Sequence, residues 1–199
     1  MKTLISVDEL HRQLDQPNLL VIDCRFSLAN VEAGPQSYLA AHIPGARYLN
    51  LNTDLSTAVV PGKTGRHPLP SREAFAGIMG ALGANDAASI VAYDDGPGAF
   101  AARLWWMLRW LGHENSAVLD GGFRAWQAAG YPVTADVPQP MQTDFAIRAP
   151  LTRTVSAADL PDTAHKMLDA RDRARYLGQN ETIDPVAGHI PGAISAPFA

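Results

Sequence analysis

Histidine, aspartate and arginine, side chains that often act as acids, bases and anion ligands, recur in this chain in matched pairs. His42 opens a His-Ile-Pro-Gly-Ala motif that returns at His189, and upstream of each an apolar run ends in Asp-x-Arg, at residues 23–25 and 169–171. No cysteine or acidic residue stands at ligand spacing from the two histidines, so the pattern predicts no metal site. We expect both histidines to make a structural hydrogen bond that shapes the turn before the proline. We expect the aspartate and arginine of the second run to form a structural pair.

The spacing of these matches indicates a duplicated domain. The paired aspartates lie 146 residues apart, the histidines 147, and a Ser-x-x-x-Leu match near the start 150. A period of this length indicates two homologous domains, because solenoid units run to about 20–50 residues. After the second His-Ile-Pro-Gly-Ala only six residues remain, whereas the first copy runs on through further strands and helices. We predict a complete domain over residues 1–132, a linker over 133–150, and a second domain over 151–199 that is cut short.

The composition is that of a globular protein and narrows the choice of partners. The 199 residues are 47% hydrophobic and 18% charged, with a formal net charge of −4. A chain of this charge is expected to bind neither nucleic acid nor an anionic membrane surface. The N-terminus shows no apolar signal segment, and the longest apolar stretch is too short to cross a bilayer. A single cysteine allows no internal disulfide, so the sequence predicts a cytoplasmic protein.

Strand and helix patterns alternate along the first copy. Short apolar runs bounded by turn residues predict buried strands at residues 19–23, 89–93 and 117–119. Serine caps, helical spacing and terminating glycines predict helices at residues 6–14, 71–82, 99–111 and 121–129. Strands separated by helices of this length form a mostly parallel sheet with helices on both faces. The expected fold class is therefore α/β.

Five further motifs stand in order around the repeated one. They are Val-Ile-Asp-Cys-Arg at residues 21–25, Gly-Arg-His-Pro-Leu-Pro at 65–70, Tyr-Asp-Asp-Gly at 93–96, Ala-Arg-Leu-Trp-Trp at 102–106 and Leu-Asp-Gly-Gly-Phe-Arg-Ala-Trp at 119–126. With the duplicated motif, this set resembles the tandem-domain rhodanese family of thiosulfate and 3-mercaptopyruvate sulfurtransferases across essentially the whole chain. The resemblance implies two rhodanese-like α/β domains, the first silent and the second carrying a cysteine that accepts a sulfane sulfur. That cysteine passes the sulfur, as a persulfide, to a thiol or cyanide, without a cofactor.

The resemblance places the persulfide cysteine in the loop between the strand at 89–93 and the next helix. A loop that enters a helix N-terminus directs several backbone N–H groups inward and lowers the pKa of a cysteine held there. In the first copy this position is Asp94, whose carboxylate we expect to accept the same N–H groups and so to silence the domain. Cys24 has Ala170 as its counterpart and is expected to be a buried structural thiol. The chain of 199 residues is therefore expected to show no sulfur transfer.

Two residues match substrate-binding positions of the family. The resemblance assigns Arg175 to holding the anionic donor near the persulfide, a task that suits the planar donor fork of a guanidinium. The alternative for Arg175 is a surface ion pair with Glu181 or Asp172. His67 matches a histidine that the mercaptopyruvate branch places at the domain interface, facing the active site. The alternative for His67 is a solvent-exposed loop histidine.

Two departures from the mercaptopyruvate branch favour thiosulfate as the donor. That branch has a second arginine nine residues after Arg175, where this chain has Asp184, and an acid near the position of Asn52. The sequence therefore predicts a thiosulfate sulfurtransferase whose partners are a small anionic sulfur donor and a thiol or cyanide acceptor. Two alternatives stay open: a 3-mercaptopyruvate sulfurtransferase and a non-catalytic rhodanese-fold binding module. The open sheet edge of a truncated second domain would also allow self-association.

Overall fold

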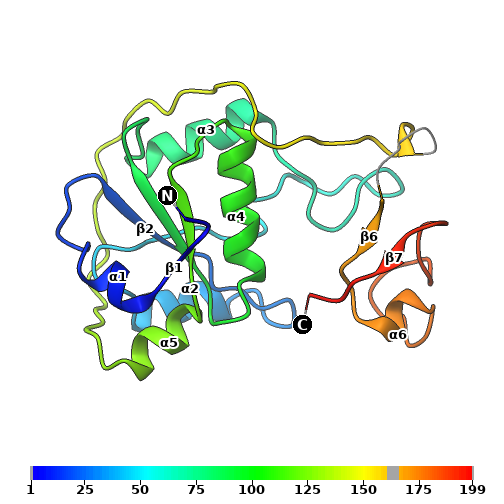
Figure 1. The fold of residues 1–199 in the computed structure, drawn as a ribbon, viewed down its shortest axis with the longest axis horizontal. Coiled ribbons are helices and arrows are strands. Elements are labelled where there is room, and N and C mark those ends of the chain that lie inside the picture. Colours follow the sequence, from blue (N-terminus) through cyan, green and yellow to red (C-terminus); the bar gives the residue numbers. More distant parts are fainter. Residues whose placement is uncertain (1, 161–165, 199) are drawn as a thin grey trace. The chain divides into compact units, whose positions relative to one another are not determined.

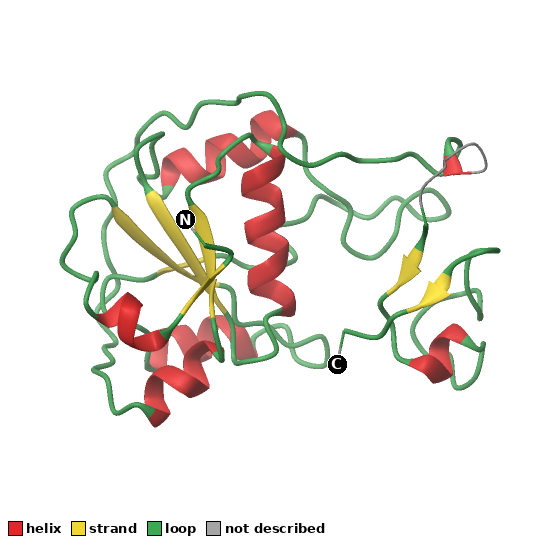
Figure 2. Ribbon diagram, in the orientation of Figure 1, coloured by secondary structure: helices red, strands yellow, loops and turns green. Residues whose placement is uncertain are grey.

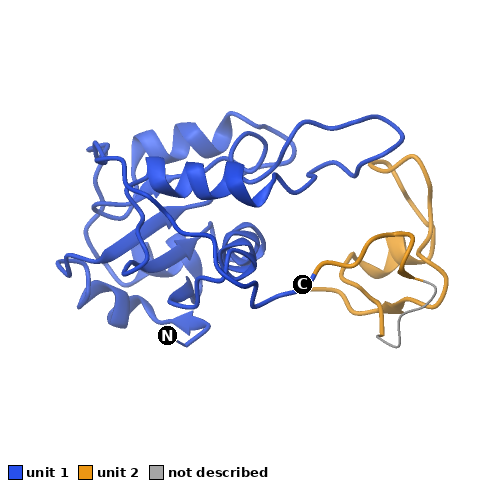
Figure 3. Cartoon of the chain, turned by 90° about the horizontal axis from the view of Figure 1, so that it is seen from above, with its two compact units in different colours: residues 1–153 blue, residues 154–199 orange. Residues whose placement is uncertain are grey.

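The computed structural model describes residues 2–160 and 166–198 of the chain. They belong to two compact units, and Figure 3 distinguishes unit 1 (residues 1–153) from unit 2 (residues 154–199) by colour. Among the described residues, no helix is long and apolar enough to cross a membrane.

Unit 1 is built around a parallel sheet of five strands (Figure 1). In spatial order these are β1 (Leu4–Ile5), β5 (Ser116–Leu119), β4 (Ser89–Tyr93), β2 (Leu19–Asp23) and β3 (Arg47–Tyr48). The central pair, β2 and β4, is aligned over all five residues, from Leu19 opposite Ser89 to Asp23 opposite Tyr93. The predicted α/β fold with a parallel sheet is confirmed.

Helices cover both faces of this sheet (Figure 2). They are α1 (Val7–His11), α2 (Ala33–Ala40), α3 (Arg72–Ala81), α4 (Ala99–Trp110) and α5 (Gly122–Ala128). Phe75 of α3 and Leu104 of α4 share one buried cluster with Ile22. Trp126 of α5 shares a second cluster with Val21. Because successive strand residues point to opposite faces, Val21 and Ile22 belong to different cores, and this explains the unbroken apolar run of β2.

Local sequence signals account for where α1 and α3 begin. Ser6 Oγ accepts from the Glu9 N–H (3.2 Å) and Glu9 Oε2 accepts from the Ser6 N–H (3.1 Å), which is the predicted capping box. Ser71 Oγ caps α3 by accepting from the backbone N–H three residues later (3.1 Å). Helix α2 and strands β1 and β3 are not evident in the sequence. The helix contains a Gly-Pro pair at residues 34–35, and each of the two strands has two residues, too few for a periodic signal.

The segment at residues 133–150, predicted as an interdomain linker, belongs to unit 1. His42 and Thr134 exchange two backbone hydrogen bonds (2.8 and 2.9 Å), and the Thr143 N–H donates to the Gly80 carbonyl (3.0 Å). The segment has no helical or strand period, so its sequence resembles a linker. Its backbone groups nevertheless find partners along unit 1, and the unit extends past the predicted boundary at residue 132.

Unit 2 repeats part of the architecture of unit 1. Its elements are β6 (Leu168–Asp169), α6 (Arg173–Tyr176) and β7 (Ile194–Ser195). Strands β6 and β7 pair in parallel, with Asp169 opposite Ser195, as Asp23 lies opposite Tyr48 in the pair of β2 and β3. The structure therefore contains the same strand pair twice, at the places where the sequence motif repeats.

The two histidines of the repeated motif make the predicted structural hydrogen bond. Nδ1–H of His42 donates to the Tyr38 carbonyl (2.7 Å), and Nδ1–H of His189 donates to the Tyr176 carbonyl (2.8 Å). Each imidazole stacks on the ring of the same tyrosine, with centroids 4.1 Å apart in unit 1 and 3.8 Å apart in unit 2. These contacts hold the turn before the proline in both copies.

The Asp-x-Arg sequences form the same bidentate ion pair in both units but in different surroundings. Nε and Nη2 of Arg25 donate to the Asp23 carboxylate at 2.7–3.1 Å, and Arg171 meets Asp169 at 2.7–3.2 Å. The side chains in unit 1 are 5% and 0% exposed, whereas those in unit 2 are 27% and 12% exposed. In unit 1 the Phe123 ring lies 4.1 Å from the Arg25 guanidinium carbon. The predicted structural pair is therefore present in unit 2 and buried in unit 1.

The duplicated pair provides a matched control for the ion pair of unit 1. Arg25→Gln should lower the free energy of unfolding of unit 1 by about 3–5 kcal/mol, because it leaves Asp23 buried without its counter-ion. Arg171→Gln removes the same contacts in unit 2. All four tryptophans lie in unit 1, so urea unfolding followed by tryptophan fluorescence reports that unit. The Arg25 variant should unfold at lower urea, and the Arg171 variant should overlay wild type. Equal shifts would show that the stability lost by unit 1 does not depend on its own ion pair.

Limited trypsin digestion tests where unit 1 ends. The Arg148 N–H donates to the Leu111 carbonyl (2.8 Å), and the Arg148 guanidinium binds the Asp86 carboxylate (2.7 Å). Arg153 is exposed and lies at the boundary between the units. We expect cleavage after Arg153 before cleavage after Arg148, since a bound backbone resists the extended conformation that a protease needs. Mass spectrometry of early fragments identifies the first cut. A first cut after Arg148 would mean that residues 133–150 do not stay on unit 1.

Candidate active site

The carboxyl ends of β2 and β4 meet where the strand order of unit 1 reverses. From β2 the chain continues to β3 on one side and then returns to β4 on the other side. In open parallel sheets such a switch point is the usual place for ligand binding. Cys24 and Asp94 directly follow the two strands, and the Cys24 N–H donates to the Tyr93 carbonyl (2.7 Å). The two candidate residues of unit 1 therefore lie at the point where this fold favours a site.

The Asp94 carboxylate fills a cradle of four backbone N–H groups at the start of α4. Its Oδ1 accepts from Gly96 and Gly98, both at 2.9 Å. Its Oδ2 accepts from Phe100 at 3.0 Å and from Ala101 at 3.4 Å. The residue is 2% exposed. The contact predicted from the sequence is thus present: a fixed anion occupies the site where a helix N-terminus would hold one.

Two glycines allow the cradle to form. Gly98 is the N-cap of α4 with φ +80°, a conformation that L side chains rarely adopt. Gly122, at φ +59°, starts α5 against the same loop, and a Cβ there would lie 2.4 Å from the Asp94 carbonyl oxygen. That oxygen accepts from the Phe123 N–H (2.8 Å). Gly122 of the Leu-Asp-Gly-Gly motif is therefore required where α5 packs against the Asp94 loop.

Cys24 is a structural thiol. It is 1% exposed and belongs to the cluster beneath α3 and α4. Burial, and then the nearby carboxylates of Asp23, Asp94 and Asp54, raise the pKa of the thiol well above its usual range. A thiol in this state supplies no thiolate at neutral pH, in agreement with the sequence prediction.

His67 lies in the loop before α3 and is half-buried. Its carbonyl accepts from Nη2 of Arg103, a residue of α4, at 3.0 Å. Its ring meets Phe26 edge-on with centroids 6.5 Å apart, and Phe26 meets Phe100, whose N–H is one of the four cradle donors. Burial, followed by the neighbouring arginines, lowers the pKa of His67. The structure therefore brings His67 to the same end of α4 as the cradle.

In unit 2, Arg175 is held by two carboxylates. Its Nε and Nη2 donate to Glu181 at 3.0 and 3.2 Å, and Nη2 also donates to Asp184 at 2.6 Å. The ion pair with Glu181 was one of the alternatives for this arginine. Asp172 does not pair with the guanidinium and instead caps α6 by accepting from the Arg175 N–H (3.0 Å).

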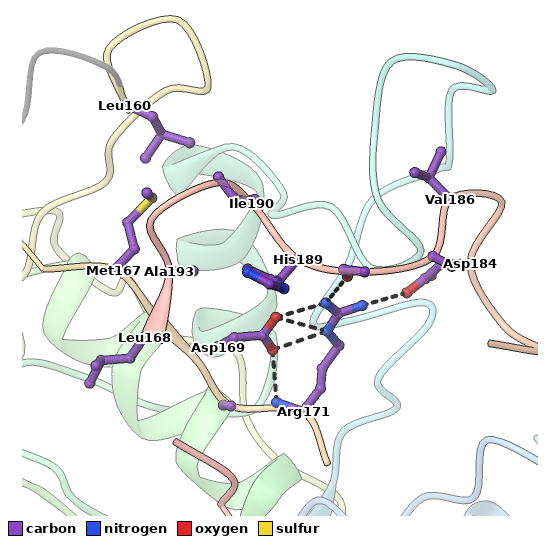
Figure 4. Close-up of a pocket in the computed structure, with 13 residues that line it drawn as sticks. Leu160, Met167, Leu168, Asp169, Arg171, Asp184, Val186, His189, Ile190 and Ala193 are labelled. Carbon is purple, nitrogen blue, oxygen red and sulfur yellow. Dashed lines mark hydrogen bonds and ion pairs between the residues drawn. The ribbon is translucent and has the colours of Figure 1, made fainter. Parts of the chain in front are cut away.

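Two pockets lie beside the arginines of unit 2. A pocket of about 700 Å³ has Arg171 on its charged side, with Asp169 and Asp184 in contact with it, and apolar residues such as Met167 and Ile190 on the other (Figure 4). A second pocket, of about 410 Å³, is lined by both Arg171 and Arg175. Across the described parts of the chain, no group of three or more His, Cys, Asp or Glu residues is placed to hold a metal ion.

The contact between Asp184 and Arg175 is the site feature that the sequence does not predict. The tyrosine and histidine that stack in each unit are 4 residues apart in unit 1 and 13 apart in unit 2. From the repeated aspartate to the repeated histidine the two units are nearly equal in length, at 19 and 20 residues, so the tyrosine lies earlier in unit 2 and a longer loop follows it. Glu181 and Asp184 lie in that loop, and spacing alone does not reveal that it folds back onto α6.

Comparisons with known proteins agree with this architecture. The family described as "Rhodanese-like domain" matches residues 6–129. A Pseudomonas aeruginosa protein described as a probable 3-mercaptopyruvate sulfurtransferase is 45% identical over 202 residues, covering 98% of this chain and 70% of that protein. Thiosulfate sulfurtransferase from Bos taurus is 33% identical over 193 residues, covering 92% of this chain and 63% of that protein. The crystal structure of a 3-mercaptopyruvate sulfotransferase from Escherichia coli matches with a TM-score of 0.86 and 31% identity, over 99% of this chain and 75% of that one.

The duplicated strand pair, the loop between β4 and α4 and the match over residues 6–129 lead to one assignment. The chain belongs to the rhodanese-like domain family.

Proposed function

We propose that this chain is part of a sulfurtransferase that moves a sulfane sulfur from thiosulfate to a thiol or cyanide through a cysteine persulfide. The observation that carries the proposal is the cradle of four N–H groups around Asp94. A loop of this form stabilises an anion, and in the second domain of such enzymes the anion would be a cysteine thiolate. In unit 1 a carboxylate takes its place, and we propose that this is why unit 1 is silent.

The chemistry needs an anion cradle at each step. A thiolate attacks the outer sulfur of thiosulfate, forming a Cys–S–S⁻ persulfide as the S–S bond of the donor breaks and sulfite leaves. The acceptor then attacks the outer sulfur of the persulfide. Cyanide leaves as thiocyanate, and the thiolate is restored. Thiolate and persulfide are both anionic, so backbone N–H groups aimed at one point stabilise both.

We assign substrate-binding roles to Arg175 and His67. The Arg175 guanidinium would bind the anionic group of the donor, and Glu181 fixes its orientation (3.0 Å). His67 lies with Phe26 and Phe100 at the cradle end of α4, and its lowered pKa keeps the ring neutral at pH 7. A neutral imidazole has one N–H group, which can donate a hydrogen bond to an anionic donor.

The second candidate is a 3-mercaptopyruvate sulfurtransferase. The 45% identity to the Pseudomonas aeruginosa relative favours it. Against it stand Asp184, which brings a negative charge to Arg175, and Asn52, which is neutral. The mercaptopyruvate branch that the chain resembles has an arginine where this chain has Asp184, so one of the two guanidinium groups for the donor carboxylate is missing. The non-catalytic alternative is a rhodanese-fold module whose cradle is permanently filled by Asp94.

The Asp94 cradle can be tested through stability. Asp94→Asn removes the charge and turns an NH₂ group toward backbone donors, so about 1–3 kcal/mol of unfolding free energy should be lost. Asp95→Asn, at the exposed neighbour, is the matched control and should change stability by less than about 0.5 kcal/mol. Asp94→Ala leaves the cradle empty, so sulfate should raise its urea midpoint and not that of wild type. If Asp94→Asn unfolds as wild type does, the carboxylate does not hold the loop.

Restoring a cysteine tests the chemistry directly. In a Cys24→Ser background, Asp94→Cys should create a thiolate in the cradle that gains one sulfur from thiosulfate, measured as a mass increase of about 32 Da on that residue. Wild type, and Asp95→Cys in the same background, should gain none. A persulfide on Cys24 of wild type would contradict the structural role of that thiol. A folded Asp94→Cys protein that never gains sulfur would contradict the proposal that the cradle is the sulfur-accepting site.

A further inference from the structure

His67 lies in the long loop between β3 and α3. This loop spans residues 49–71, all of them described, and contains neither a helix nor a strand. Its first part is fixed by burial, since Leu55 is fully buried and Ser56 is 6% exposed. Residues 57–66 are all exposed. His67 therefore follows an exposed stretch of irregular chain, and its position depends on specific contacts.

The imidazole of His67 is restrained on its apolar side alone. Its ring meets Phe26 edge-on, and Phe26 meets Phe100 of α4 with centroids 5.6 Å apart. Neither ring nitrogen of His67 makes a hydrogen bond to any residue that the structure describes. The polar side of the ring is therefore available to a ligand, and the place of the ring depends on what holds the backbone of His67.

The backbone of His67 is held by Arg103, a residue of α4. Nε and Nη2 of Arg103 converge on the Leu55 carbonyl, at 3.1 and 2.7 Å. Nη2 also donates to the His67 carbonyl at 3.0 Å and lies 3.3 Å from Ser56 Oγ. One guanidinium therefore connects the buried beginning of the loop to the residue that follows its exposed part.

The charge of Arg103 is not compensated by a carboxylate. Its acceptors are neutral oxygens, and no acid pairs with it in the described parts of the chain. Burial lowers the pKa of Arg103. The charge also acts on His67, because burial, followed by Arg103 and Arg66, lowers the pKa of the imidazole. Arg103 therefore affects both the place of His67 and its protonation.

We infer that Arg103 is a positioning residue that holds His67 at the cradle end of α4. This inference rests on the role of His67 in the proposed function. Phe100 and Arg103 are three residues apart in α4 and so lie on the same side of the helix. The Phe100 N–H donates to the Asp94 carboxylate, and Arg103 donates to the His67 carbonyl. One turn of α4 thus connects the cradle to the histidine, and Arg103 acts through His67 without touching the donor.

The test compares two variants of Arg103 with a matched control on the same helix. Arg103→Gln removes both the charge and the planar donor fork, whereas Arg103→Lys keeps the charge and loses the fork. Arg109→Gln is the control, because Arg109 also belongs to α4 but its guanidinium carbon lies 5.2 Å from the Trp105 ring centroid, and it makes no contact with the loop.

Two NMR measurements follow the loop and the imidazole, and neither requires turnover. Hydrogen exchange at the Thr57 N–H reports whether the two arms of the loop stay together, because this group donates to the Pro68 carbonyl (3.0 Å). A pH titration reports the pKa of His67, and the His67→Gln variant identifies its resonance among those of the six histidines. A contact that only stabilised unit 1 would leave the pKa of His67 unchanged.

In Arg103→Gln, exchange at Thr57 should be faster by about tenfold or more, because the hydrogen bonds from a charged donor that hold the loop are lost. The pKa of His67 should rise, since a neighbouring cation is lost and the ring becomes more hydrated. Arg103→Lys should also speed the exchange, with a smaller rise in the pKa of His67. Arg109→Gln should match wild type in both measurements.

The inference requires both changes in Arg103→Gln. If either one is missing, or if Arg109→Gln shows the same changes, the inference is overturned. Should Arg103→Gln not fold, Arg103→Lys takes its place, and exchange at the wild-type rate in that variant overturns the inference. Neither measurement involves sulfur transfer, so a failure of the proposed function would appear in the Asp94→Cys experiment and not here.

Discussion

The buried pair of Asp23 and Arg25 is the interaction on which the arrangement of unit 1 depends. The Asp23 carboxylate also accepts from the Tyr93 hydroxyl of β4 (2.8 Å), and Nη2 of Arg25 also donates to the Ala41 carbonyl before the His-Ile-Pro-Gly-Ala turn (2.6 Å). The guanidinium lies over the Phe123 ring of α5. One ion pair therefore connects β2, β4, the motif turn and α5. Because both charges are buried, the pair is stable only while all these partners are in place.

The sequence predicts the elements whose signals are local and periodic. The strands at Leu19–Asp23 and Ser89–Tyr93 have the predicted bounds, because burial on both faces requires unbroken apolar runs. Helix α2 is not predicted, since its helical form depends on tertiary contacts and not on an apolar stripe. The sequence predicts a linker at residues 133–150, whereas the structure places this segment in unit 1. Hydrogen bonds from an irregular backbone to a distant part of the fold leave no pattern in composition, so the sequence does not reveal them.

The candidate site residues likewise make some contacts that the sequence predicts and others that it does not. Asp94 is predictable because its contacts are made within seven residues along the chain, in a loop whose form is set by the strand before it and the helix after it. The pairing of Asp184 with Arg175 depends on how the loop after α6 folds back, which a spacing of nine residues leaves undetermined. In both units, however, an anion-binding group is bound by carboxylates of the chain itself. In unit 1 the backbone N–H groups of the cradle bind Asp94, and in unit 2 Arg175 binds Glu181 and Asp184.

The filled cradle also affects how this domain can evolve. A carboxylate that binds four backbone donors contributes to folding, so selection for a folded chain is sufficient to retain it, whether or not any substrate is ever bound. A lineage that exchanged a nucleophile for this acid would gain stability at a position where activity once required a reactive group. Return to the ancestral residue would then pass through less stable intermediates. On the proposed function, the silent state of unit 1 would therefore be maintained by folding and not by function.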